Sequence, residues 1–258
     1  DLVNRDNWHN CPINEWGRTN EYFPVHQDVV SMANTVQPWR TRELHDVCML
    51  VYKPHRVADP GNFTKVYRAL ETGDIDYSYW NPQTENAPDT AAMIYTGAEW
   101  LDSASANRLA DWVEAGGTLV LFSRFPSEDE TGASLNRLPI RPPDGVRPVG
   151  LPVTVRFEND SVELSNAGHM GRKINLFYYH SVEGEPITAT LSSESKEELV
   201  DIGVVNAATF RMGYCVPVGR GRLVHVGAAP CASLLHLVLA QLDLAPHSHC
   251  DGGIFTTT

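Results

Sequence analysis

Short apolar runs alternate with amphipathic stretches through the first half of the chain. Residues 91–95 and 118–122 are apolar runs that predict buried strands. Between them, apolar side chains recur three and four positions apart, which predicts a helix that begins near Asp102 or Ser103 and ends at Gly116-Gly117. A strand–helix–strand unit this compact predicts two parallel strands joined by a right-handed crossover.

The same patterns predict further elements on both sides of this unit. The predicted strands are 45–52, 76–80 and 222–226, and the predicted helices are 25–36, 62–71 and 233–242. We expect a loop after the first strand, where Pro54 and Pro60 interrupt the pattern. Strands that alternate with helices in this way predict an α/β protein with a flavodoxin-like parallel sheet.

The second half of the chain has a different pattern. Residues 126–150 carry five prolines and predict an irregular excursion. Short β runs follow at 153–157, 162–164, 174–179 and 187–191, and they predict a β-rich insertion at about 146–200. Gly219-Arg220-Gly221 predicts a hairpin turn between strands 208–218 and 222–226, because glycine adopts positive φ angles readily.

Charge and composition exclude some classes of protein. The net charge is −12 and basic side chains form no cluster, which argues against a general nucleic-acid binder. No apolar run approaches the ~18 residues of a membrane helix. Five cysteines without CxxC spacing favour free thiols, with a single disulfide as the alternative. The chain starts at Asp1, inside a polar segment, and we expect a processed subunit or a fragment of a longer protein.

The predicted carboxyl edge of the sheet carries charged side chains but no nucleophile. Glu99 follows the strand 91–95, at the edge where open α/β sheets bind ligands. The turn TGAEW (96–100) contains neither cysteine nor serine, and the chain has no GxSxG sequence. Arg124 and the acidic run 128–130 follow the next strand and predict a solvated loop or an intersubunit contact. We therefore expect this edge to be non-catalytic.

Two groups of side chains are of the types that bind zinc. One comprises His247, His249 and Cys250, and the other comprises Cys231 and His236. Their spacing matches no standard zinc pattern, and the glycines form neither GxGxxG nor a P-loop. The sequence therefore predicts no metal and no cofactor.

Residues 1–27 form a polar segment rich in aromatic side chains, among them Trp8 and Trp16. Loops of this composition line carbohydrate sites, because an aromatic face packs on sugar C–H groups while carboxylates and amides bind hydroxyls. The alternative is a linker whose aromatic side chains fill a neighbouring core.

The sequence NRDNWHNCPINEWGRTNEYF (4–23) resembles the end of the catalytic TIM barrel in β-galactosidase-type glycoside hydrolases of families 35 and 42. Asn14 stands where the family usually has aspartate. Residues 91–132 and GRGRLVHVGAAP (219–230) resemble the class I amidotransferase-like α/β domain that follows the barrel. In some relatives this domain mediates oligomerisation and is not catalytic.

The resemblance implies three domain segments. Residues 1–40 would end a barrel-like segment, 41–245 would form the amidotransferase-like domain, and 246–258 would begin a further β domain. The catalytic glutamates would lie outside this chain, on a TIM-barrel chain or segment that is its partner. If any residue here reaches a carbohydrate substrate, the resemblance implies Trp8, Glu15 and Trp16.

Two hypotheses about function follow. In the first, the chain is a non-catalytic segment or subunit of a retaining, β-galactosidase-like hydrolase, completes the barrel edge and mediates packing in a homo- or hetero-oligomer. In the second, it is an independent amidotransferase-like binding or assembly module. A cysteine- or metal-dependent enzyme, built on Cys231 or the 247–250 loop, is a third alternative.

Overall fold

The computed structural model describes residues 18–19, 23–37, 45–58, 60–165, 173–191 and 209–244, and the backbone of 248–251 and 254–257. The chain divides into two units, Asp1–Leu44 and His45–Thr258. The described part of the first unit consists mainly of helix α1 (Phe23–Val36), as the sequence predicts. None of the residues of α1 is buried.

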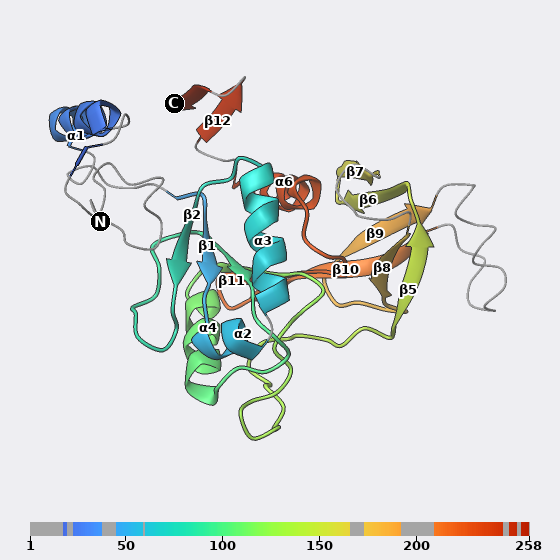
Figure 1. Ribbon diagram of the computed structural model, residues 1–258. Coiled ribbons are helices and arrows are strands. Elements are labelled where there is room, and N and C mark those ends of the chain that lie inside the picture. Colours follow the sequence, from blue (N-terminus) through green and yellow to red (C-terminus); the bar gives the residue numbers. More distant parts are fainter. Residues whose placement is uncertain are drawn as a thin grey trace. The chain divides into compact units, whose positions relative to one another are not determined.

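The second unit is built on a nine-stranded sheet with the strand order β2-β1-β3-β4-β11-β10-β9-β6-β7 (Figure 1). Its first five strands are parallel to one another. They are β2 (Tyr77–Trp80), β1 (Val47–Leu50), β3 (Ala92–Tyr95), β4 (Thr118–Leu121) and β11 (Gly221–Val226). The predicted α/β class with a parallel sheet is therefore confirmed.

Helices cover both faces of this parallel half (Figure 1). Helices α3 (Pro60–Thr72) and α6 (Ala232–Gln241) pack on one face, and α4 (Ser103–Glu114) packs on the other. Alternate residues of β1 enter the two cores: Val47 and Met49 lie with α3 and α6, whereas Cys48 and Leu50 lie with α4. Every residue of β1, β3 and β4 is buried, which explains their uninterrupted apolar sequences.

The other four strands extend the same sheet in antiparallel fashion. They are β10 (Thr209–Val218), β9 (Glu185–Leu191), β6 (Val153–Phe157) and β7 (Asp160–Leu164). Strands β5 (Gly145–Gly150) and β8 (Lys173–Tyr178) pair as a separate two-stranded sheet. The β-rich insertion thus contributes three strands to the main sheet and two to a smaller one.

The ends of α4 agree with the sequence analysis in detail. The Asp102 carboxylate accepts a hydrogen bond from the backbone N–H of Ser105 at 2.9 Å and caps the helix. At the other end Gly116 has a φ of +129°, a conformation that is unfavourable for side chains larger than glycine. The hairpin between β10 and β11 is also confirmed, with Gly219 at φ +59°.

Two segments differ from the predictions. The expected loop after β1 contains a helix, α2 (Lys53–Ala58), in which Pro54 occupies the first turn, where the missing N–H costs nothing. The expected irregular excursion at 126–150 ends in strand β5. In the C-terminal segment, strand β12 (Ser248–Asp251) pairs with β13 (Ile254–Thr257) in a two-stranded sheet.

Candidate functional site

The turn between β3 and α4 lies at the carboxyl edge of the parallel strands, and hydrogen bonds fix its backbone. The amide of Asn62 on α3 donates to the carbonyl oxygen of Gly97 at 3.0 Å. The hydroxyl of Tyr95 donates to the carbonyl oxygen of Ala98 at 2.6 Å, and the hydroxyl of Thr96 donates to that of Leu50 on the neighbouring strand. The chain's own hydrogen bonds therefore hold the backbone of this turn in place.

Aromatic side chains fill the space beside this turn. The buried ring of His55 on α2 lies 4.5 Å from the ring of Tyr52 and 4.9 Å from the ring of Trp100, centroid to centroid. A Cβ atom on Gly97 would lie 2.3 Å from Nδ1 of His55 and 2.6 Å from the ring of Tyr95. A nucleophilic side chain at Gly97 would therefore have no room unless the rings moved.

His55 was missed by the sequence analysis, because its segment was expected to be a loop. Its Nε2 is hydrogen-bonded to the carbonyl oxygen of Trp100. A histidine beside such a turn could serve as a general base, but Gly97 offers no hydroxyl or thiol for it to activate. The arrangement therefore supports a packed elbow and gives no support to acyl transfer.

The charged residues of this edge hold the following segment in place. Glu99 and Arg124 form an exposed ion pair. The Asp129 carboxylate accepts hydrogen bonds from the backbone N–H groups of Thr131 and Ala133, at 2.8 and 2.9 Å. The Thr131 hydroxyl also donates a hydrogen bond to this carboxylate and has the largest effect on its pKa. Together these hydrogen bonds lower the pKa of Asp129 to about 2. An ionised carboxylate engaged in this way is structural and is not a general acid.

Glu130 occupies the N-terminus of α4. Its Oε2 accepts a hydrogen bond from the backbone N–H of Ser103 at 2.7 Å, where the helix dipole favours negative charge. The hydroxyl of Ser103 donates to Asp129 at 3.1 Å. The acidic run, which the sequence predicted as a solvated loop or an intersubunit contact, thus caps α4 within this chain.

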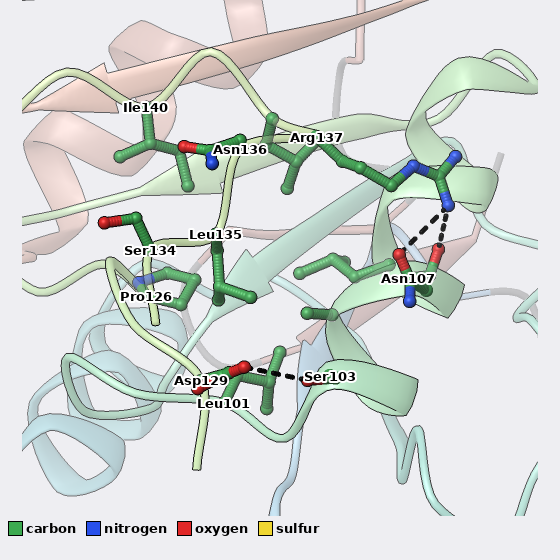
Figure 2. Close-up of a pocket in the computed structure, with 13 residues that line it drawn as sticks. Leu101, Ser103, Asn107, Pro126, Asp129, Ser134, Leu135, Asn136, Arg137 and Ile140 are labelled. Atoms are coloured by element: carbon green, nitrogen blue, oxygen red, sulfur yellow. Dashed lines mark hydrogen bonds between the residues drawn. The ribbon is translucent and has the colours of Figure 1, made fainter. Parts of the chain in front are cut away.

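A pocket of about 330 Å³ opens between α4 and the segment 126–140 (Figure 2). Figure 2 shows Ser103 and Asn107 on the helix side, with Leu135 and Ile140 contributed by the facing segment. The lining residues are mainly apolar in the interior and polar at the rim: Leu101, Ser103, Ala106, Asn107, Leu109, Pro126, Asp129, Ser134, Leu135, Asn136, Arg137, Leu138 and Ile140.

Several polar groups of this pocket already have partners within the chain. The guanidinium of Arg137 contacts the carboxylates of Asp111 and Glu114 at 2.8 and 2.9 Å. It also lies 3.4 Å from Oδ1 of Asn107. Asp129 is the only carboxylate in the lining, whereas glycoside hydrolysis uses two facing carboxyl groups. The pocket is suited to receive an apolar group and lacks the groups for hydrolysis.

The residues predicted to reach a sugar, Trp8, Glu15 and Trp16, lie outside the described residues, as does His247. Cys231 is the N-cap residue of α6, and burial raises the pKa of its thiol. His236 lies on the same helix. In the part of the chain that the structure describes, no three His, Cys, Asp or Glu side chains gather to hold a metal ion. Likewise no described helix is long and apolar enough to cross a membrane.

Residues 59–229 match a family model described as a domain of unknown function, DUF4350. The chain belongs to this family. A sequence comparison with curated proteins finds no match. The family model covers most of the parallel half of the sheet and the whole β-rich insertion. Because the family is described as one of unknown function, membership by itself assigns no activity.

Three solved structures similar to this chain are β-galactosidases. A GH42 enzyme from G. stearothermophilus has a TM-score of 0.57 and 15% identity, over 93% of this chain and 36% of that enzyme. The enzyme from a Rahnella species has a TM-score of 0.60 and 14% identity, over 96% and 39%. The enzyme from Bacillus circulans sp. alkalophilus has a TM-score of 0.57 and 13% identity, over 96% and 39%.

At such low identity the similarity shows a shared fold. This chain spans between 36% and 39% of the length of these three enzymes. Its fold is thus related to a part of GH42 β-galactosidases.

Proposed function

We propose that the chain is a non-catalytic segment or subunit of a β-galactosidase-like glycoside hydrolase. In this proposal it completes the edge of a TIM barrel, which carries the catalytic carboxylates, and mediates packing between domains or subunits. The observation that carries the proposal is the coverage of the structural matches: nearly all of this chain corresponds to little more than a third of each β-galactosidase.

The surface of α1 supports a partner for the first unit. Val25, Val29, Met32 and Val36 recur at intervals of four, three and four residues, so they form one stripe along the helix. Each of these side chains is at least half exposed, from 50% for Val29 to 64% for Val36. An apolar stripe of this kind indicates a surface that another element covers. We infer that the barrel is this element and that α1 is its last helix.

The geometry of the carboxyl edge supports a role without catalysis for the second unit. Rings fill the space beside Gly97, and the pocket next to α4 has a single carboxylate. In the proposal, contact with a carbohydrate substrate comes from Trp8, Glu15 and Trp16 at the rim of the barrel, and residues 246–258 lead into a further β domain.

One observation favours the alternative of an independent binding or assembly module. The unit His45–Thr258 has extensive hydrophobic cores on both faces of its own sheet, and such a unit has the means to fold alone. This alternative shares the fold but needs no barrel.

An activity assay on the purified 258-residue chain separates catalysis in this chain from catalysis elsewhere. We expect no hydrolysis of 4-nitrophenyl β-galactoside above the buffer rate. Hydrolysis that co-elutes with the pure chain and is absent from a mock purification would overturn the proposal.

The apolar stripe provides a second test, in the particle that carries the galactosidase activity. Val29→Asp together with Met32→Asp should lower the temperature at which that activity is lost, because the substitutions place charges in the contact with the barrel. Gln27→Asp together with Asn34→Asp is the matched control, since these exposed residues lie on the opposite side of α1. Equal effects of the two pairs would contradict the assignment of the stripe.

A further inference from the structure

A second groove lies on the opposite side of α4 from the segment 126–140, next to the edge strand β2. It has a volume of about 570 Å³ and is formed by the loop that follows β2 and by the second half of α4. Its lining combines two indoles with amide, carboxylate and guanidinium groups: Trp80, Gln83, Thr84, Glu85, Asn86, Ala87, Arg108, Asp111, Trp112 and Ala115. The proposed function above does not use this groove.

Hydrogen bonds hold the loop 81–87 in a defined conformation. The backbone N–H of Gln83 donates to Oδ1 of Asn81 at 3.0 Å, and the backbone N–H of Asn81 donates to Oε2 of Glu85 at 2.9 Å. Arg108 on α4 donates to the carbonyl oxygen of Pro82 at 2.8 Å and so ties the loop to the helix. Because both walls are fixed, a ligand would meet a groove that is already formed.

Trp80, one of the lining residues, has a buried polar group without a partner. Its side chain is 1% exposed, and its Nε1 has no hydrogen-bond partner in the structure as described. A buried indole N–H usually finds a partner, since an unsatisfied donor is unfavourable. An acceptor oxygen that reaches this covered Nε1 would remove the penalty.

The second indole is held rigidly. A Cβ atom on Gly117 would lie 2.5 Å from the ring of Trp112, so the glycine packs directly against this indole. Trp112 is 8% exposed, so the ring forms a rigid apolar wall and leaves little of its area open to a ligand. The groove therefore has a rigid apolar wall beside an unsatisfied donor.

The remaining groups define the chemistry of the ligand. The exposed amides of Gln83 and Asn86 offer donors and acceptors, and Arg108 is balanced by the carboxylates of Glu85 and Asp111. Asp111 is also paired with Arg137 at 2.8 Å, so the charges around the groove nearly cancel and give no preference for a charged ligand. A fixed groove with mixed donors and acceptors, and with an unsatisfied indole N–H among its lining residues, suits an uncharged molecule with many hydroxyl groups.

We propose that the groove between the loop 81–87 and α4 binds a short, uncharged oligosaccharide. A ligand hydroxyl accepts the hydrogen bond of Trp80 Nε1, and the amides of Gln83 and Asn86 bind further hydroxyls. Binding in this groove does not require the barrel of the proposed function to exist. The groove would hold carbohydrate on the α/β domain itself.

Isothermal titration of the 258-residue chain with lactose, galactobiose, xylotriose and maltotriose tests the site. We expect at least one of these neutral sugars to bind. Gln83→Ala together with Asn86→Ala should weaken that binding about tenfold or more, because two hydrogen-bonding groups are lost. Asn175→Ala is the matched control, since this exposed amide lies on β8, and it should leave the affinity unchanged.

Trp80 provides a readout that depends on the donor itself. In ¹H–¹⁵N spectra, the indole N–H signal that disappears in Trp80→Phe should shift when the sugar is added to the native chain. Trp80→Phe keeps an aromatic ring and should weaken binding severalfold. Absence of binding by all four sugars would overturn the proposal. Binding that the Gln83/Asn86 variant leaves intact, or binding of glucuronate or glucosamine alone, would also overturn it.

Discussion

The parallel and antiparallel halves of the main sheet bury their strands in different ways. In β3 and β4 every residue is buried, because α3 and α6 cover one face and α4 covers the other. In β6 buried residues alternate with more exposed ones, since mainly one face has a partner. Strand β10 joins the two halves and has a central run of four buried residues. The candidate site lies beside the parallel half, where two packed cores hold the loops at the carboxyl edge.

The largest expected effect comes from polar substitutions at adjacent positions in the two halves. In β4, Leu119→Asn and Val120→Asn should each destabilise the fold by more than about 3 kcal/mol, because both faces are buried. In β6 only Val155→Asn should do so, and Arg156→Asn should change stability by less than about 0.5 kcal/mol. Urea unfolding measures all four. A tolerated substitution at both Leu119 and Val120 would contradict the two-sided burial of the parallel half.

The junction of the two halves should make stability depend on pH. His225 on β11 is fully buried: its Nε2 lies 3.1 Å from the carbonyl oxygen of Phe122, and its Nδ1 lies 2.7 Å from the hydroxyl of Tyr179. Because a carbonyl only accepts, Nε2 carries the proton and Nδ1 accepts from Tyr179. Burial lowers the pKa of His225 to about 4, against the opposing effect of the Phe122 bond.

The unfolded chain therefore takes up a proton on His225 near pH 6.5, whereas the folded chain does so only near pH 4. The contribution of His225 to the free energy of unfolding is therefore fully present above pH 6.5. It falls by about 3 kcal/mol as the pH drops from 6.5 to 4. His225→Phe should remove this part of the pH dependence, while His180→Gln, at an exposed position, should retain it. Urea unfolding at pH 4.5 and 7.5 compares the three proteins. If His225→Phe and the native chain lose the same free energy of unfolding between these two pH values, the assignment to His225 is refuted.

The packed elbow of the parallel half should resist even one added methyl group. Gly97→Ala should cost about 1–3 kcal/mol, because its Cβ meets the rings of His55 and Tyr95. The double variant Gly97→Ala/His55→Ala should cost less than the sum of its single variants, since the smaller residue relieves the clash. Additive costs would show that the ring of His55 does not occupy the space beside Gly97. Thermal unfolding is sufficient for this cycle.

The smallest expected effect compares two helices of the parallel half. Asp102→Ala should cost about 1 kcal/mol, because it removes the side chain that caps α4. Cys231 occupies the same position on α6 and makes no such capping bond, so Cys231→Ala should cost less than about 0.5 kcal/mol. Reversed costs in urea unfolding would show that the cap contributes little to α4.

The sequence predicted the parallel half well because its strands and α4 carry their own local signals. Residues 91–95 are a continuous apolar run, and Asp102 and Gly116 mark the ends of the helix. Helix α2 was missed because it is short and contains Pro54. Strand β5 was missed because Pro148 and its flanking glycines suggest a turn, and because its partner β8 starts 23 residues after β5 ends.

The candidate site was harder to predict because it depends on contacts between distant residues. The sequence indicated that the turn 96–100 has no nucleophile, but the packing of His55 beside Gly97 joins residues 42 positions apart. Leu135 and Ile140 lie in a segment without periodicity, and only the folded chain brings them to α4. The residue types alone predicted that the turn has no nucleophile, whereas the pockets form only in the folded chain.

The composition of the native particle tests the central claim most directly. The particle that contains this chain is isolated by size exclusion, assayed for galactosidase activity, and analysed by intact-mass and peptide mass spectrometry. The proposal predicts a TIM-barrel sequence in stoichiometric amount, either continuous with this chain or on a second polypeptide, and activity that follows it. A particle that contains only this chain and has no glycosidase activity would contradict the proposal and favour the independent module.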